Sequence, residues 1–234
     1  MNCVITGATK GIGRATAELL AKHNHHLYIC SRKEEELKAF KRDLQQINPN
    51  INVSYSALDL SDKTQVYSLA ADILSTWPVV DVLINNAGYF SPSDMLEESD
   101  EEMEALMNIN FFAPFYLTKA LVPSMINAQK GHIINICSIA SQRAYPKSGS
   151  YSTTKFALYG FTKALREDLK GEKVKVTAVL PGPTWTNSWA GVDLPEDRLM
   201  QPEAVAQSIL HAISLPGSAV LEEIILRPQE GDLE

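Results

Sequence analysis

The sequence predicts an α/β fold: a doubly wound parallel sheet with helices on both faces. Short runs rich in β-branched residues alternate with amphipathic segments along all 234 residues, a pattern typical of repeated βα units. Most strand candidates are continuously apolar, as expected when both faces of a parallel sheet are covered. The candidate strands span residues 3–6, 26–30, 52–58, 80–85, 132–138, 174–180 and 222–226.

The segments between these strands have the spacing of surface helices. In residues 33–47, apolar side chains recur every three or four positions while Lys and Glu side chains face away. In residues 97–104, Ser99 or Asp100 is expected to cap a helix that begins with acidic residues. No internal repeat or Pro/Gly-rich linker interrupts the pattern, so we expect one domain spanning residues 1–234 with right-handed crossovers.

Composition and charge exclude several classes of partner. The formal net charge is −7 and there is no basic block, so neither nucleic acid nor an anionic membrane is an expected partner. The chain begins with a strand-like run, and no apolar run approaches the length of a membrane span. Cys3, Cys30 and Cys137 each lie in an apolar run, where a free thiol behaves as a small hydrophobic group. We therefore expect a reducing compartment, the cytoplasm.

A glycine-rich turn follows the first strand and leads into an apolar helix. This turn, TGATKGIG, contains Gly7, Lys10, Gly11, Ile12 and Gly13. Glycines let the backbone approach a pyrophosphate, whose charge is stabilised by the free N–H groups and the dipole at the helix N-terminus. Glycine-rich turns also occur as plain connections, but the position between strand and helix favours nucleotide binding.

The second strand ends in CSRK, where dinucleotide sites place the residue that contacts the adenosine ribose. Ser31 and Arg32 stand there in place of an acid, and Lys10 adds a second cation. Arg can hold a 2′-phosphate through charge-assisted hydrogen bonds, whereas a carboxylate would repel it. The alternative is that both cations are solvated surface charges, since acids follow at residues 34–36. The pattern favours NADP over NAD.

Taken together, the motifs resemble the short-chain dehydrogenase/reductase family. They are TGATKGIG, NNAG at residues 85–88, NINFF around Asn110, INICSIAS around Ser138, the pair Tyr151 and Lys155, and PG at residues 181–182. This resemblance covers residues 6 to 186 in the order of the family. It implies a Rossmann-type seven-stranded sheet, a nicotinamide cofactor, and a catalytic group formed by Asn110, Ser138, Tyr151 and Lys155.

The stretch SGSYSTTKFALYGF places Tyr151, Lys155 and Tyr159 four residues apart on one helical face. Carbonyl reduction needs a proton donor near the substrate oxygen, and a phenol can serve if its pKa of ~10 falls. A unit charge at ~4 Å contributes about 4 kcal/mol at an effective dielectric near 20, so Lys155 is expected to lower the pKa of Tyr151. The helix dipole favours Tyr151 over Tyr159, with Ser148 and Ser150 as capping candidates.

Two polar residues complete the expected catalytic group. Ser138 ends a strand, so its hydroxyl is expected to orient the substrate oxygen. Taken alone, it would be interpreted as an ordinary turn serine. Its position thirteen residues before Tyr151 matches the family pattern and favours the catalytic role. Asn110 interrupts an apolar helical stretch, where a buried amide needs partners. The resemblance implies that Asn110 holds a water in a proton relay to Lys155, which is compatible with a structural role in bending the helix.

The resemblance assigns further residues to the cofactor, although turn chemistry alone would also explain them. It implies that Asn86, Ala87 and Gly88 border the adenosine side, that Asp59 and Leu60 contact the adenine, and that Lys155 also holds the nicotinamide ribose. The residues expected beside the nicotinamide amide are Pro181, Gly182, Thr184 and Thr186.

Residues 183–201 lack clean periodicity and lie where the family has a variable substrate loop. Aromatic and sulfur-containing side chains there and at nearby strand exits could wall a carbonyl or alcohol substrate, or could equally cover the core; they are Phe90, Tyr145, Trp185, Trp189 and Met200. The ending EEIILRPQEGDLE is more similar to bacterial pterin-ketone reductases related to sepiapterin reductase than to glycine-rich family endings.

Two function classes stay open. The first is an NADP(H)-dependent carbonyl reductase or alcohol dehydrogenase, with pterin-ketone reduction as a specific form. The second is a non-catalytic NADP-binding regulatory protein, and the presence of all four catalytic residue types favours the enzyme.

A homodimer or homotetramer is implied by the resemblance. No metal site is expected, since residues 23–26, HNHH, have no accompanying carboxylate or thiol cluster.

Overall fold

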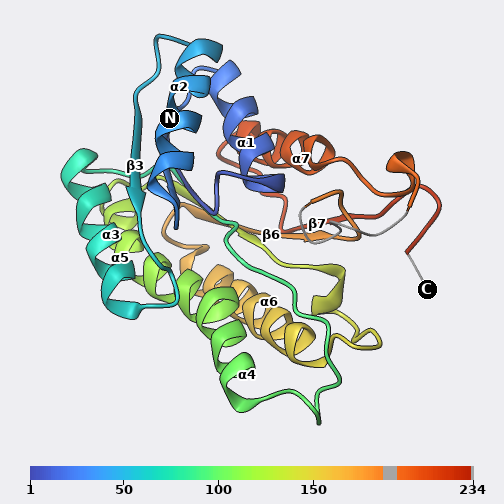
Figure 1. Cartoon of the computed structure of the whole chain (residues 1–234). Helices are drawn as coiled ribbons and strands as arrows, with labels where there is room; N and C mark the ends of the chain where they lie inside the picture. Colours follow the sequence, from blue (N-terminus) through green and yellow to red (C-terminus); the bar gives the residue numbers. More distant parts are fainter. Residues whose placement is uncertain (187–193, 233–234) are drawn as a thin grey trace.

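One parallel sheet of seven strands runs through the protein, as seen in the computed structural model (Figure 1). The structure describes residues 1–186 and 194–232. The strands are β1 (Asn2–Thr6), β2 (His26–Ser31), β3 (Val53–Ala57), β4 (Val82–Asn85), β5 (Gly131–Ile136), β6 (Val174–Pro181) and β7 (Glu223–Leu226). Every neighbouring pair is parallel, in the order β3-β2-β1-β4-β5-β6-β7. The predicted fold class is confirmed.

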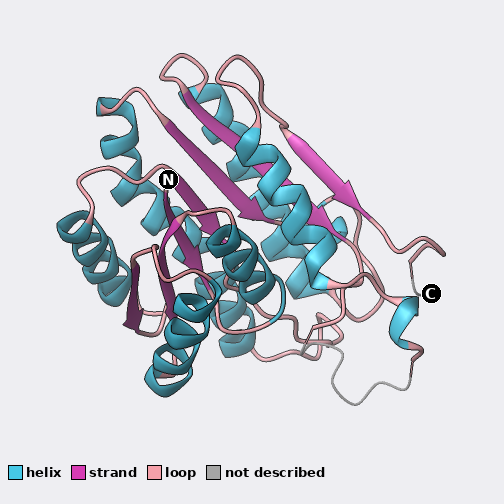
Figure 2. Cartoon of the chain, turned by 90° about the horizontal axis from the view of Figure 1, so that it is seen from above, coloured by secondary structure: helices cyan, strands magenta, loops and turns pink. Residues whose placement is uncertain are grey.

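Helices cover both faces of this sheet, with α1, α2 and α7 on one side and α3, α5 and α6 on the other (Figures 1 and 2). The α-helices are α1 (Gly11–Lys22), α2 (Glu34–Ile47), α3 (Lys63–Thr76), α4 (Asp100–Met107), α5 (Ala113–Asn127), α6 (Gly149–Leu169) and α7 (Pro202–Ser214). Shorter segments are the π-helical turn η1 (Asn108–Phe112) and the 3₁₀ turns η2 (Ile139–Ser141) and η4 (Glu196–Arg198). In the described ranges, no helix has the length and apolarity needed to cross a bilayer.

The strand sequences are continuously apolar because consecutive side chains enter two different apolar layers. Ile5 and Ile84 pack in the layer beneath α1, α2 and α7, whereas Val4 and Leu83 pack in the layer beneath α3 and α5. All four side chains are fully buried. Alternation along the central strands thus produces two cores, one on each face, whereas the edge strands β3 and β7 are partly exposed.

Helix α2 begins one residue later than expected and ends where the periodicity ends. Helix α4 is capped by Ser99, whose side chain accepts a hydrogen bond from the N–H of Glu102. The expected side-chain cap on α6 is wrong for Ser148, the N-cap residue, which makes no cap hydrogen bond. Its hydroxyl instead donates to the carbonyl of Tyr145, so the preceding turn, rather than the helix N–H groups, uses this side chain.

The point at which the chain reverses direction across the sheet lies between β1 and β4. From β1 the chain builds outward through β2 to β3, then returns to place β4 on the other side of β1. In open sheets of this kind, the connections leaving the two central strands diverge, and a crevice opens beyond their carboxyl ends. The glycine-rich turn after β1 and the NNAG exit after β4 therefore border the same crevice.

A chain of buried polar side chains runs from helix α5 over strands β4 and β5 to helix α6, on one face of the sheet. The amide of Asn85 on β4 donates to Thr118 on α5 at 3.0 Å and to Asn135 on β5 at 2.8 Å. Asn135 in turn donates to the hydroxyl of Thr162 on α6 at 2.9 Å. All four residues are buried, so each of these hydrogen bonds satisfies polar atoms that would otherwise have no partner in the core.

We expect replacement of Asn135 by Ala to lower the free energy of unfolding by about 1 to 3 kcal/mol, because it removes two buried hydrogen bonds, one accepted from the Asn85 amide and one donated to the Thr162 hydroxyl. Urea unfolding followed by circular dichroism would measure the loss. Asn127→Ala, at an exposed position, is the control and should change the free energy of unfolding by less than about 0.5 kcal/mol. Equal losses in the two variants would contradict the role given to the buried chain.

Candidate active site

The glycine-rich turn after β1 exposes backbone N–H groups to a ligand on one side and packs tightly against the β4 exit on the other. Gly7 has a φ of +64°, a conformation that favours glycine. A Cβ on Gly13 would lie 2.4 Å from the carbonyl oxygen of Gly7 and 2.5 Å from the amide nitrogen of Asn86, so no side chain fits there. Helix α1 starts at Gly11, and its N-cap Lys10 supplies no side-chain cap. The first N–H groups of α1 are therefore left to bind an anion.

The exit of β4 is fastened to this turn by side chain to backbone hydrogen bonds. The hydroxyl of Thr6 accepts from the N–H groups of Asn86 and Ala87 at 3.0 and 2.9 Å. The amide of Asn86 donates to the carbonyls of Thr6 and Gly7 at 2.9 and 3.1 Å. The side chain of Asn86 thus holds the two walls of the crevice together, which is a structural use that the cofactor assignment did not include.

The expected ribose-contacting residues lie at the β2 exit beside the glycine turn. Arg32 is exposed and makes no hydrogen bond or ion pair with the residues that the structure describes. Lys10 is exposed as well, but its ammonium lies 3.5 Å from Glu36. Ser31 accepts a hydrogen bond from Thr9 at 3.4 Å. The sequence did not indicate the contact made by Glu36. This residue lies in the first turn of α2, and its carboxylate points back toward the crevice.

The remaining cofactor candidates border the same crevice. Asp59 is exposed just after β3 and uses one carboxylate oxygen to accept from the N–H and hydroxyl of Ser61, whereas the neighbouring Leu60 is buried. The segment after β6 crosses to the glycine turn, because a Cβ on Gly11 would lie 3.0 Å from the Cγ2 of Thr186.

Beyond β6 the chain is fixed by backbone contacts. Pro181 ends β6, Gly182 donates its N–H to Leu226 on β7 at 2.8 Å, and the hydroxyl of Thr184 donates back to the carbonyl of Gly182 at 2.9 Å. Trp185 pairs with Met200 through a backbone hydrogen bond of 2.7 Å, so the two ends of the expected substrate loop adjoin. Trp189 lies outside the described residues.

Lys155 is a buried cation at the centre of the site. Only 4% of the residue is exposed, and its ammonium donates to the carbonyl of Ile136 at the end of β5, at 2.9 Å. Burial lowers the pKa of Lys155 from 10.5 to about 8, because the charged form loses its hydration. The ammonium is therefore still the main form at neutral pH, but it is easily deprotonated compared with a surface lysine.

Tyr151 lies one turn before Lys155, with the Lys155 ammonium 5.7 Å from the centre of its ring. The ring of Phe90 packs edge-on against it, with centroids 5.0 Å apart. Burial raises the pKa of the phenol, and hydrogen bonding with Ser138 acts in the opposite direction without overcoming it. The expectation that Lys155 lowers this pKa is wrong for this arrangement, because the desolvation of the phenolate dominates and the ammonium is held by Ile136.

Asn110 lies in the π-helical turn η1 and is fully buried. Its amide oxygen accepts from the N–H of Tyr89 at 3.0 Å, and its nitrogen donates to the carbonyl of Tyr89 and the hydroxyl of Thr154 at 3.1 and 3.0 Å. A Cβ on Gly88 would lie 2.8 Å from this amide oxygen and 3.5 Å from the ammonium of Lys155. The β4 exit, η1 and α6 therefore meet at one point, and the extra residue of a π turn is what places Asn110 there.

Ser138 follows β5 and is 8% exposed. Its hydroxyl accepts a hydrogen bond from the N–H of Ala140 at 3.1 Å, and its own N–H donates to Ser141, which together form a capping box for η2. The turn after β5 is therefore rigid, and it holds the Ser138 oxygen next to the phenol of Tyr151. Tyr159, by contrast, lies two turns after Tyr151 on α6, and its hydroxyl donates to Glu223 on β7 at 2.6 Å.

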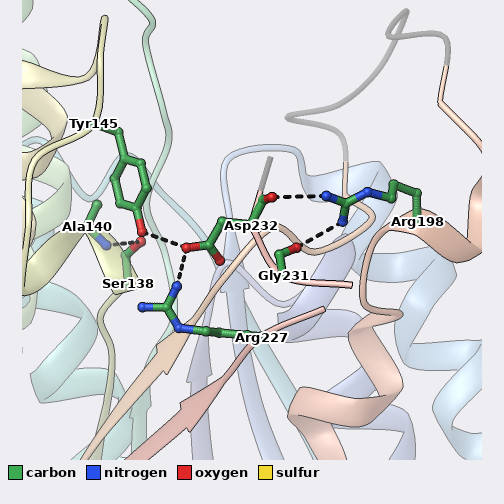
Figure 3. A network of polar contacts seen from close by, with 7 residues as sticks. All are labelled: Ser138, Ala140, Tyr145, Arg198, Arg227, Gly231 and Asp232. Carbon is green, nitrogen blue, oxygen red and sulfur yellow. Dashed lines mark hydrogen bonds and ion pairs between the residues drawn. The ribbon is translucent and has the colours of Figure 1, made fainter. Parts of the chain in front are cut away.

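The C-terminal segment closes the site opposite Ser138, an arrangement that sequence reasoning missed (Figure 3). Asp232 accepts a hydrogen bond from the hydroxyl of Tyr145 at 2.9 Å and forms an ion pair with Arg227. Arg198 donates to the carbonyls of Gly231 and Asp232 at 2.9 and 3.0 Å, joining the tail to the end of the substrate loop. The second carboxylate oxygen of Asp232 is buried and has no hydrogen-bond partner among the described residues.

Other titratable groups near the site have no sign of reactivity. The thiol of Cys137 is buried between β5 and α6, and burial raises its pKa to about 11. Within residues 1–186 and 194–232, no three His, Cys, Asp or Glu side chains gather in a way that could hold a metal ion. The groups available for chemistry are thus the partly buried phenol of Tyr151, the buried ammonium of Lys155, the hydroxyl of Ser138 and the amide of Asn110, beside a cradle for an anion.

Comparison with known proteins agrees with this arrangement. The family model described as short chain dehydrogenase matches residues 2–196. A sepiapterin reductase of Chlorobaculum tepidum is 34% identical over 239 residues, covering 99% of this chain and 97% of the relative. An alcohol dehydrogenase from Thermococcus sibiricus, complexed with 5-hydroxy-NADP, superposes with a TM-score of 0.92 at 26% identity over 100% of this chain and 98% of that one. An L-sorbose reductase from Gluconobacter frateurii, complexed with NADPH and L-sorbose, gives 0.90 at 26% identity over 97% and 95%.

We expect Gly13→Ala to destabilise the protein by about 1 to 3 kcal/mol, since the added methyl group would overlap the backbone of Gly7. Gly160→Ala, in the exposed middle of α6 with no atom within 4 Å of the added Cβ, is the matched control. It should stabilise by roughly 0.5 to 1 kcal/mol, because Ala has the higher helix propensity. Thermal unfolding of both variants measures the difference, and a neutral Gly13→Ala would show that the turn is loosely packed.

Proposed function

Because this chain belongs to the short-chain dehydrogenase family and is an oxidoreductase of that family, we propose that it transfers hydride between NADP(H) and a carbonyl or alcohol carbon. The observation that carries the proposal is the position of the Tyr151 phenol. It is partly buried beside Ser138, lies one turn before Lys155 on α6, and is at the sheet edge where the glycine turn forms an anion cradle. We further propose that residues 1–234 work as one catalytic unit, with residues 183–201 as its substrate loop.

The cradle fits a dinucleotide phosphate group. Gly7, Gly11 and Gly13 leave no side chain between the backbone N–H groups and the crevice, and Lys10 and Arg32 carry positive charge at the β2 side. A carboxylate at position 32 would repel a 2′-phosphate, whereas the guanidinium can hold it. When bound, the nicotinamide supplies the hydride. The NADP and NADPH complexes of the two structural neighbours support the same choice of cofactor.

For reduction, the protein must hold the carbonyl oxygen and provide one proton. We propose that Ser138 donates a hydrogen bond to that oxygen. The raised pKa of Tyr151 keeps its phenol protonated at neutral pH, the form that can give the proton. As hydride reaches the carbon and the C=O π bond breaks, the Tyr151 proton passes to the oxygen and yields the alcohol. We propose that Lys155, one turn along α6, returns a proton to the resulting phenolate, and that Asn110, which lies beside the ammonium, links it to a proton relay.

A pterin ketone is the second candidate, favoured by the unpartnered oxygen of Asp232. This carboxylate is fixed by Tyr145 and Arg227, and its free oxygen lies 3.5 Å from where a Cβ on Gly182 would be, on the nicotinamide side of the site. An aminopyrimidinone ring presents adjacent N–H donors that a carboxylate oxygen can accept. The 34% identical relative named as a sepiapterin reductase adds support to this narrower proposal.

We propose a homodimer or homotetramer and a cytoplasmic location as further expectations from family membership. Neither enters the chemistry above, since all four catalytic candidates come from this one chain: Asn110, Ser138, Tyr151 and Lys155.

We expect Tyr151→Phe to lower kcat for carbonyl reduction by at least about 100-fold, because the proton donor is lost, with the dissociation constant for NADPH within about threefold of the wild type. The loss of NADPH absorbance against ketones, aldehydes, quinones and diketones measures turnover. Tyr159→Phe is the matched control, because that phenol bonds to Glu223 away from the site, and it should keep nearly full activity. Full turnover by Tyr151→Phe would eliminate Tyr151 as the acid.

The same assay separates the enzyme from a non-catalytic NADP-binding regulator. Thermal stabilisation by NADPH without turnover of any carbonyl would favour the regulator.

If a pterin ketone is the substrate, Asp232→Asn should lower kcat/KM for sepiapterin by about tenfold or more, since a charge-assisted hydrogen bond to the ring is lost. The value for a small neutral diketone should change by less than about threefold, because that substrate has no N–H donors for the carboxylate. Steady-state kinetics with both substrates provide the measurement. Equal losses for the two would show that Asp232 acts only by holding the tail in place.

A further inference from the structure

A carboxylate lies among the cations at the β2 side of the crevice. One oxygen of Glu36 is 3.5 Å from the ammonium of Lys10 and 3.3 Å from that of Lys33, and its other oxygen accepts from the hydroxyl of Thr9 at 3.4 Å. Lys10 belongs to the glycine turn and Lys33 to the β2 exit. Glu36 therefore bridges the two segments that flank the position expected for the adenosine ribose.

Glu36 differs from the two acids that precede it in the same helical turn. Glu34 and Glu35 both pair with Lys38, on the outward side of α2, at 3.1 and 2.9 Å. The side chain of Glu35 is 84% exposed, whereas that of Glu36 is 33% exposed. Partial burial disfavours the Glu36 carboxylate, but hydrogen bonding with Lys33 and the charge of Lys10 together lower its pKa, so it is anionic at neutral pH.

We infer that Glu36 is a specificity-determining residue that competes with the cofactor's 2′-phosphate for Lys10 and Lys33, and so restrains the preference for NADP(H) over NAD(H). The inference rests on the proposed function, because it presupposes that the adenosine ribose lies between the glycine turn and the β2 exit. A 2′-phosphate and a carboxylate require the same cations, and two anions that share them repel each other.

The competition acts on one form of the cofactor only. NAD(H) carries a 2′-hydroxyl, which leaves the contacts of Glu36 with Lys10 and Lys33 in place. NADP(H) must draw the two ammonium groups toward its phosphate while Glu36 stays within reach of both. Arg32, which makes no ion pair with the described residues, is unaffected by this exchange and remains available to the phosphate. Removing the negative charge of Glu36 should therefore strengthen NADP(H) binding selectively.

The test compares the dissociation constants of NADPH and NADH, measured by fluorescence titration of the purified full-length protein. For Glu36→Gln we expect the NADPH constant to fall about threefold to tenfold, the range for two partly exposed ion pairs, and the NADH constant to change less than about twofold. Glu35→Gln removes the same charge one residue away, where the contact is with Lys38, and should change both constants by less than about twofold.

A coupling experiment identifies the cations. In a Lys10→Met background the gain from Glu36→Gln should shrink, because one of the two released cations is missing. The inference is overturned if Glu36→Gln leaves the NADPH constant unchanged or raises it, if it changes both constants by the same factor, or if Glu35→Gln gives the same gain. A wild-type protein that binds neither cofactor would overturn the proposed function together with this inference, whereas tight NADPH binding with no response to Glu36→Gln overturns this inference alone.

Discussion

The site depends on the hydrogen bonds that join the exits of β1 and β4. These are the two strands between which the chain reverses, so their carboxyl ends diverge and a crevice opens there. Thr6 accepts from two N–H groups of the β4 exit, and the amide of Asn86 returns two hydrogen bonds to the β1 exit. These four bonds fix the width of the crevice, and the close packing of Gly13 against Gly7 fixes its floor. Every residue assigned to the cofactor is placed relative to these two walls.

Burial, rather than attraction between charges, sets the protonation of the reacting groups. It raises the pKa of Tyr151 and of Cys137 and lowers that of Lys155 to about 8, so each group is shifted toward its neutral form. For Tyr151 the neutral form is a proton donor. For Lys155 the lowered pKa makes the ammonium an easier proton source, which is what the proposed return of a proton to Tyr151 needs. For Cys137 the neutral form is a thiol, the less reactive state, because burial outweighs the opposing effects of Lys155, Thr162 and Ser141 on its pKa.

The sequence predicted those features that depend on short stretches of chain. Helix 33–47, the cap at Ser99 and the buried strands follow from local periodicity and propensity, and the structure confirms them. The pKa of Tyr151 was predicted in the wrong direction, because spacing along a helix cannot show that the Lys155 ammonium is turned to Ile136. The bridge from Glu36 to Lys10 and the contact of Asp232 with Tyr145 join segments distant in the chain, and no pattern within either segment indicates them. The assignment of catalytic and cofactor roles to individual residues stays a prediction.

Different parts of the chain build the two ends of the crevice, so the residues proposed for proton transfer are separate from those proposed for substrate selectivity. The proposed proton transfer uses side chains that follow β5 or lie on η1 and α6, and all of them except the partly buried Tyr151 are buried. The proposed substrate side is formed by Arg198 from η4 and Asp232 from the C-terminal tail, linked to each other through the tail carbonyl. Because Arg198 and the tail contact each other and Tyr145 rather than Tyr151 or Lys155, we expect changes there to alter which carbonyl substrate fits without disturbing the two residues proposed for proton transfer.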